Sequence, residues 1–83
     1  MHEWTIAQGL LNTALEEAGK HSARRINLFR IKLGDGNQLE PSSLEFCLDA
    51  LSKGTIAEGA IFEIETISGW ESFIENIEVE QEG

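Results

Sequence analysis

Basic residues and cysteine are scarce in this chain, and each scarcity excludes a class of protein. The 83 residues carry 6 Lys and Arg against 15 Asp and Glu, for a net charge of −9. Because phosphate backbones and anionic lipids attract basic surfaces, this balance argues against binding to nucleic acids or membranes. The single cysteine, Cys47, can form neither an internal disulfide nor a CxxC metal site. We therefore expect a neutral, cationic or metallic partner.

Long apolar runs and the features of a secretory signal are also missing. No segment approaches the roughly 18 consecutive apolar residues that a membrane span needs. The first residues lack a basic region followed by an apolar one. Because nothing indicates an oxidising compartment, the sequence predicts a cytoplasmic protein. Its length predicts one domain over residues 1–83.

Catalytic motifs are absent as well. The sequence has no Gly-rich phosphate loop, no GxSxG and no HExxH. His21, the only histidine besides His2, follows Lys20 in a stretch that favours a solvated loop. Cys47 falls on an apolar helical stripe, where cysteine acts as a small hydrophobe rather than a nucleophile. We therefore expect no enzymatic activity.

Apolar spacing predicts two helices. The first covers residues 4–18, and Gly19 would end it in a left-handed conformation. The second begins beside Pro41, with Ser42 and Glu45 at capping-box spacing, and Gly54 follows its end. Its apolar stripe has i, i+3, i+4 and i+7 spacing and consists of Leu44, Cys47, Leu48 and Leu51.

Alternating patterns predict three strands, at residues 24–34, 60–67 and 72–80. The element order is then α-β-α-β-β, which favours an α+β fold with two layers. Two amphipathic helices would pack on one face of a three-stranded sheet. On the other face, Arg30 and Lys32 would lie opposite glutamates of the neighbouring strands, and those glutamates are Glu63, Glu65, Glu78 and Glu80.

The chain opens with Met1 and His2, and two interpretations of this dipeptide stay open. A terminal residue is usually frayed and solvated, which would leave His2 without a role. Alternatively, the α-amine of Met1 and the amide nitrogen and imidazole of His2 can close fused chelate rings around one ion. The amide of Glu3 or an external ligand would supply a fourth donor. Planar nitrogen donors suit Ni(II) or Cu(II) better than Zn(II), which prefers a tetrahedron.

Three motifs occur in the order typical of one protein family. They are MHE at residues 1–3, GTIAEGA at 54–60 and GWESFIENIEVE at 69–80. Together they resemble the HypA/HybF family of nickel-incorporation accessory proteins for NiFe hydrogenase and, in some organisms, urease. The resemblance implies a metallochaperone that holds Ni(II) at Met1, His2 and Glu3. It also implies a HypB-type GTPase as partner and the hydrogenase large subunit as recipient.

The sequence departs from the family pattern between its last two predicted strands. The family normally inserts a zinc-binding domain with two CxxC motifs there, whereas EIETISGWESF runs through residues 63–73 without a cysteine. We therefore expect the zinc domain to be absent between about residues 67 and 69, and we expect no bound zinc. A minimal natural member, a paralogue with a changed role and a chain from which the domain was removed all fit this pattern.

A second reading of the same fold needs no metal. The chain could be a HypA-like interaction or regulatory module, with Trp4 or Trp70 on its contact surface. A homodimer is a further expectation, because a sheet edge left uncovered by the missing domain can pair with a second chain.

Overall fold

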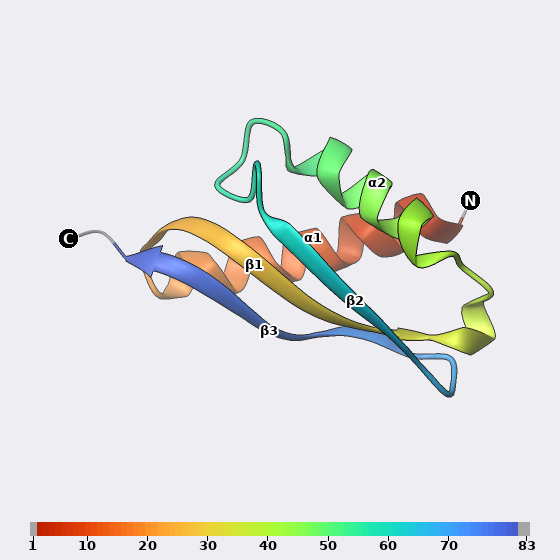
Figure 1. Ribbon diagram of the computed structural model, residues 1–83. Helices are drawn as coiled ribbons and strands as arrows, with labels where there is room; N and C mark the ends of the chain where they lie inside the picture. Colours follow the sequence, from red (N-terminus) through yellow and green to blue (C-terminus); the bar gives the residue numbers. More distant parts are fainter. Residues whose placement is uncertain (1, 82–83) are drawn as a thin grey trace.

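The computed structural model describes residues 2–81, and its elements follow the predicted order (Figure 1). A short 3-10 helix, η1, is the one element that the sequence did not predict in this described range. The elements are α1 (His2–Lys20), β1 (Ala23–Gly34), η1 (Asp35–Asn37), α2 (Pro41–Ser52), β2 (Ile61–Ile67) and β3 (Ser72–Gln81).

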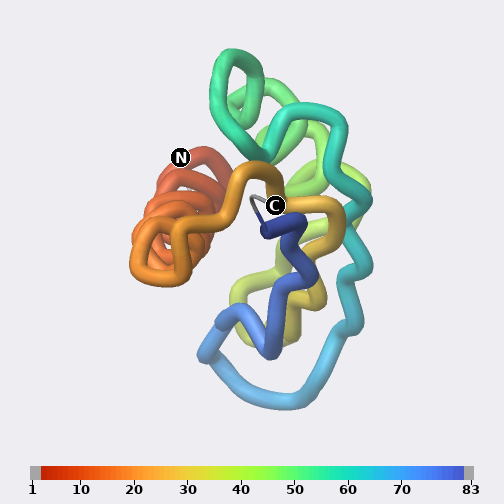
Figure 2. Tube along the Cα trace, turned by 90° about the vertical axis from the view of Figure 1, so that its left-hand side faces the viewer, coloured from red at the N-terminus to blue at the C-terminus, as the bar shows by residue number. Residues whose placement is uncertain are grey.

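The three strands form one mixed sheet with β1 in the centre. Strand order is β2-β1-β3, and β1 runs parallel to β2 and antiparallel to β3. Both helices pack on the same face of the sheet, and Figure 2 shows α1 nearly end-on beside the strands. The predicted two-layer α+β fold is confirmed. Within residues 2–81, neither helix is long and apolar enough to cross a membrane.

The core lies between this face of the sheet and the helices. Phe29 and Ile31 of β1 are fully buried, and the Phe29 ring packs against that of Phe62 from β2, tilted by 43°, with centroids 4.8 Å apart. A bulge between Ile26 and Leu28 shifts the alternation of side chains. Ile26 and Phe29 consequently belong to the same core although they are three positions apart.

The predicted end of the first helix is wrong in detail. Gly19 does not end α1, which continues to Lys20, and the left-handed residue after the helix is Ser22, with φ of 54°. The helix needs no glycine there because the turn that follows satisfies its last carbonyls: the amides of residues 21 and 22 donate to the carbonyls of Ala18 and Gly19.

The capping box predicted for α2 is also wrong. Glu40 is the N-cap residue and makes no side-chain capping hydrogen bond, while Pro41 starts the first turn. Ser42 therefore lies inside the helix, two positions after the N-cap residue. Proline suits this position because its missing amide hydrogen would have no helical acceptor. Gly54 follows the helix end with φ of 81°, as predicted.

The open face of the sheet carries ion pairs at three of the four glutamates that the sequence predicts. Glu80 is the exception: the strand register places it opposite Arg25, and it lies 3.9 Å from Arg24. Arg30 lies 3.2 Å from Glu63 of β2 and 3.0 Å from Glu78 of β3. Lys32 pairs with Glu65 and lies 3.5 Å from Glu75. The hydrogen bond to Glu65 is the largest cause of the raised pKa of Lys32. These pairs connect the central strand to both of its neighbours.

The connection between β2 and β3 is a short turn at residues 68–71, and η1 holds it in place. The Gly36 amide donates to the Gly69 carbonyl at 2.7 Å. The Asn37 side-chain amide donates to the Trp70 carbonyl at 2.8 Å. The Gly69 amide donates in return to the Asp35 carboxylate at 3.1 Å. Residues 35–37 therefore fix the path of the turn between β2 and β3, which is where the sequence departs from its family pattern.

Candidate functional site at the start of α1

Of the three predicted nickel ligands, the structure fully places only Glu3. Met1 and the side chain of His2 lie outside the described residues, whereas the backbone of His2 begins α1. Glu3 is half-buried in the first turn of the helix. The structure therefore positions the backbones of His2 and Glu3 in the first turn of α1.

The start of a helix leaves its first amide groups without helical acceptors. The N–H groups of His2 and Glu3 lie in the first turn of α1, where the helix itself provides no carbonyl to which they could donate. The positive end of the helix dipole also lies here, and it favours an anionic group. Glu3 provides negative charge in this turn. The amide nitrogen of His2 that the predicted chelate requires, and that of Glu3, its possible fourth donor, are thus free of helical hydrogen bonds.

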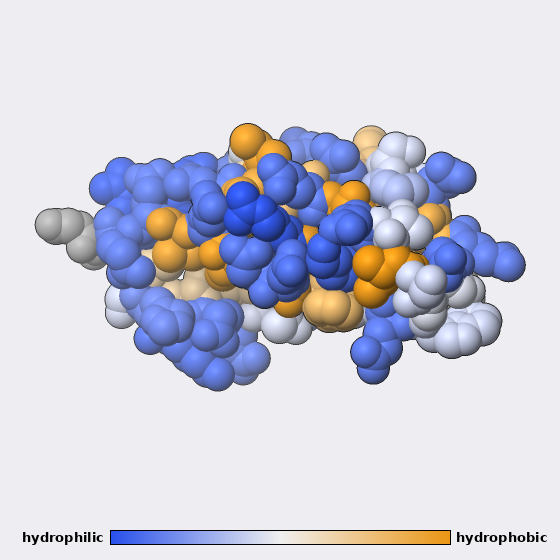
Figure 3. Space-filling view, turned by 60° about the horizontal axis from the view of Figure 1, so that its bottom comes forward, coloured by the Kyte–Doolittle hydropathy of each residue, from blue (hydrophilic) through white to orange (hydrophobic). Residues whose placement is uncertain are grey.

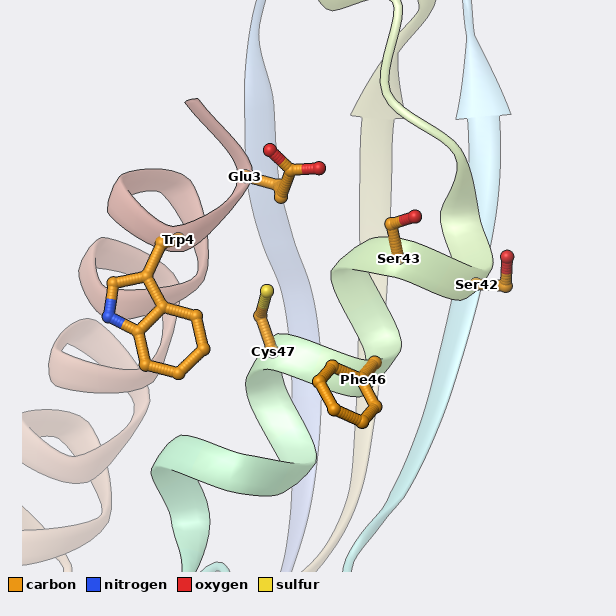
Figure 4. A pocket seen from close by; sticks show the side chains of 6 residues that line it. All are labelled: Glu3, Trp4, Ser42, Ser43, Phe46 and Cys47. Carbon is orange, nitrogen blue, oxygen red and sulfur yellow. The ribbon is translucent and has the colours of Figure 1, made fainter. Parts of the chain in front are cut away.

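A shallow depression adjoins the candidate site, between the first turn of α1 and the first half of α2 (Figure 4). Trp4 and Phe46 flank it as large apolar side chains with exposed fractions of 41% and 73%. Its lining residues are Glu3, Trp4, Ser42, Ser43, Phe46 and Cys47. An apolar surface of this kind beside a charged helix end suits contact with another protein.

Phe46 is the residue of this surface that the sequence reasoning missed. It follows Glu45 and precedes Cys47, so it lies off the stripe at Leu44, Cys47 and Leu48 that packs on the core. The sequence did contain a signal that Phe46 is exposed. It directly precedes Cys47 of the buried stripe, and adjacent residues of a helix do not point to the same face.

Cys47 contributes no ready metal ligand to this surface. Its thiol is buried in the described structure, as the sequence predicts. Burial is the main cause that raises the pKa of Cys47, and the negative charge of Glu3 adds to it. Because a thiolate rather than a thiol binds metals, a raised pKa makes Cys47 a poor ligand near neutral pH.

No other metal centre is visible in residues 2–81. The described side chains contain no cluster of three or more His, Cys, Asp or Glu that could hold an ion. His21 is exposed after α1, and its Nε2 lies 3.2 Å from the Glu17 carboxylate, so it has the solvated position that the sequence predicts. An N-terminal chelate would use amine and amide nitrogens, which such a side-chain cluster does not involve.

Comparison with solved structures first defines the class of fold. A structure described as "Solution structure of the Ni metallochaperone HypA from Helicobacter pylori" superposes with a TM-score of 0.84. The match covers 99% of this chain and 100% of that chain, at 15% sequence identity. The α+β architecture is therefore the fold of a known metallochaperone.

Sequence comparison then identifies the family. Residues 1–72 match the family described as "Hydrogenase/urease nickel incorporation, metallochaperone, hypA". Hydrogenase maturation factor HypA of Methanopyrus kandleri is 44% identical over 70 residues, which are 84% of this chain and 49% of that protein. The protein of the same name from Dechloromonas aromatica is 36% identical over 69 residues, which are 83% of this chain and 61% of that protein.

The chain belongs to the HypA family. It spans between 49% and 61% of the length of these two relatives. The family description and the relatives' names refer to metallochaperones and maturation factors, which is consistent with the expectation that the chain is not an enzyme.

Proposed function

We propose that this chain binds one Ni(II) ion at Met1, His2 and Glu3 and delivers it during hydrogenase maturation in the cytoplasm. The observation that carries the proposal is the start of α1 at His2 in a member of a nickel-incorporation family. There the peptide nitrogens of His2 and Glu3 are free of helical hydrogen bonds. The Met1 amine and the His2 imidazole would complete a planar nitrogen set of the kind that Ni(II) favours.

The amide and imidazole donors suit a carrier that must also release its metal. Each donor binds nickel only after it loses a proton, so lower pH favours release. The net charge of −9 favours the approach of cations in general. Affinity and release are thus both features of the same short segment.

The proposed protein partners are a HypB-type GTPase and the hydrogenase large subunit, or the urease system in its place. The depression beside Glu3 supports this proposal because it places the exposed Trp4 and Phe46 next to the proposed nickel ligands. A partner that covered these side chains would approach the ion directly. Large exposed apolar side chains are frequent anchors in protein interfaces.

We also propose that the turn at residues 68–71 takes the place of the family's zinc-binding domain, so that nickel binding by these residues needs no zinc. The hydrogen bonds from η1 support this, because they hold the turn as an integral part of the sheet end. Trp70 lies against Gly36 there, where any added Cβ would approach the indole ring to 2.7 Å.

An isothermal Ni(II) titration with absorption spectra tests the nickel site. We would use tag-free protein that begins at Met1, prepared in parallel with and without prior zinc removal. We expect one bound ion with a square-planar absorption band in both preparations. The His2→Ala variant and a version extended before Met1 should lose the band. The matched control His21→Ala should keep it, because His21 is exposed after the far end of α1.

A second candidate function is a HypA-like interaction or regulatory module that binds no metal tightly. The exposed Trp4, Phe46 and Trp70 favour it, the last with an exposed fraction of 77%. The same titration separates the two functions. If His2→Ala and the extended version bind nickel as the parent does, or if none of them binds it, the N-terminal site is disproved and the interaction module takes its place.

A further inference from the structure

Strand β3 has an uncovered edge. It lies at one side of the sheet and pairs only with β1 among the described residues. The amide and carbonyl groups on its outer side are therefore a template for another strand. At ten residues (Ser72–Gln81), β3 is also longer than β2, the other edge strand, which has seven.

A groove runs along this edge, between β3 and α1. It consists of two adjoining depressions that share Thr13 and Ile74, and it extends from Trp70 to His21. Figure 3 views the molecule from the side of β3 and shows apolar atoms exposed between hydrophilic masses above and below.

The walls of the groove have complementary sizes. On the α1 side its middle is lined by the small residues Gly9, Thr13 and Ala14, with larger side chains towards its two ends. On the β3 side, Ile77 and Val79 pack against the core and are still reached from outside. Small helical residues leave room beside these branched side chains, so apolar groups of an added strand could enter and lose contact with water.

The other face of β3 selects for positive charge. Glu75, Glu78 and Glu80 lie on this strand, which contains no basic residue. They already lie near Lys32, Arg30 and Arg24 of β1. Arg30 and Lys32 are each shared with a glutamate of β2, so the carboxylates outnumber their basic partners and the face stays negative. An added strand alternates its side chains between the groove and the open face of the sheet. Residues that enter the groove should be apolar, and those that lie beside the glutamates should be basic.

The negative charge of β3 also argues against a second copy of this chain as the strand that pairs with this edge. Pairing of two β3 strands would bring their glutamates together across the new edge, and like charges in directly opposite positions destabilise a sheet. The net charge of −9 on each copy adds to this repulsion. The homodimer expected from the sequence is therefore disfavoured at this edge.

We propose that the β3 edge binds an extended segment of a basic partner protein, in which apolar and basic residues alternate, as a fourth strand of the sheet. Its apolar side chains occupy the groove along α1, and its basic side chains pair with the glutamates of β3. Backbone hydrogen bonds provide affinity, and the alternation provides specificity. This interaction does not depend on the proposed nickel site, which lies at the start of α1.

A capped peptide of about nine residues that alternates valine and lysine is the probe, matched to the span of the strand. Binding to the full chain is followed by backbone amide NMR shifts and by amide hydrogen exchange. We expect shifts along β3 and along the groove face of α1, with slower exchange in β3. A peptide with the same residues in two blocks has the same charge and should bind at least about tenfold more weakly. An alternating valine and glutamate peptide should not bind.

Two variants of equal charge locate the site. Thr13→Arg places a long side chain where the two depressions join, and should weaken binding at least about tenfold. Asn12→Arg adds the same charge at an exposed neighbouring position that does not line the groove, and should change affinity less than about twofold. Both positions are exposed on α1, so both variants should fold.

Several results would overturn the proposal. Equal affinity for the alternating and blocked peptides would reduce the interaction to general attraction between opposite charges. Shifts confined to β2 or α2 would put the peptide elsewhere. Light scattering over a range of concentrations tests for a dimer of the chain alone. If it showed a dimer that dissociates on dilution, and if the β3 amide shifts changed with concentration, a second copy would be the occupant instead.

Discussion

The two faces of the sheet differ sharply although they share the same strands. On β1, Phe29 and Ile31 are buried beneath the helices, while their neighbours Arg30 and Lys32 form ion pairs on the open face. The covered face removes apolar area from water, which is the main source of stability. The open face joins the strands by pairs that remain exposed to solvent. Adjacent residues of one strand thus have separate tasks.

The comparison predicts unequal effects of truncation on the two faces, and this is the largest difference that we expect. Phe29→Ala removes a fully buried ring and its contact with Phe62, and should lower the free energy of unfolding by about 3–5 kcal/mol. Urea unfolding followed by circular dichroism measures the change. Arg30→Ala on the next residue should have a much smaller effect, because exposed ion pairs are weak. Similar losses for both variants would refute the division of tasks.

At the end of β1, the effect of a substitution should depend on the available space rather than on apolarity or charge. An added Cβ at Gly34 would lie 2.6 Å from the Glu71 carbonyl oxygen and 2.7 Å from that of Gly69. Backbone atoms cannot move aside cheaply, so Gly34→Ala should destabilise the protein by about 1–3 kcal/mol. The same urea measurement applies. Gly9→Ala is the control: nothing lies near its added Cβ, and alanine should stabilise α1 there by up to about 1 kcal/mol.

The regular parts of this fold were predictable because they depend on local periodicity. The stripe at Leu44, Cys47 and Leu48 was correctly expected to be buried, and the pairing of Arg30 with glutamates on both sides was expected from alternation in three strands. The direction of the strands, with β1 parallel to β2 and antiparallel to β3, was not predicted, because it depends on packing between segments that are distant in sequence. The bulge after Ile26 likewise breaks the alternation for a reason visible only in the sheet.

The candidate site was predictable in part. The sequence predicts a chelate at the N-terminal dipeptide, which stays a prediction, and the structure adds that α1 begins at His2. The depression beside it could not be anticipated, because it combines Glu3 and Trp4 of one helix with Phe46 and Cys47 of another. Only the packing of α1 on α2 brings these residues together.

The covered side of the sheet also contains a polar atom that should weaken it. The Ser52 side chain is fully buried at the end of α2, and its hydroxyl has no hydrogen-bond partner in the described structure. A buried unpaired hydroxyl is unfavourable, so Ser52→Ala should raise the free energy of unfolding by about 1 kcal/mol. Urea unfolding measures this gain. Ser43→Ala, at a position exposed to the depression, is the control and should have little effect; a destabilised Ser52→Ala variant would reveal a partner for the hydroxyl.

The smallest expected effect lies at Cys47. Its thiol is buried against the core, and the negative charge of Glu3 also acts on it. Both raise its pKa, so the folded chain retains the thiol proton at a pH where the unfolded chain loses it. This contribution to stability is complete below the ordinary thiol pKa of about 8.5 and is lost as pH rises through the raised value. Alkylation of the folded chain at pH 8–9 should therefore be slower than alkylation in urea. Glu3→Gln should raise the folded rate at constant pH, because it removes a negative charge that opposes thiolate formation, whereas Glu16→Gln should leave it unchanged. A rate that ignores Glu3→Gln would mean that burial alone controls Cys47, and that the charge at the start of α1 does not extend into the space between the helices.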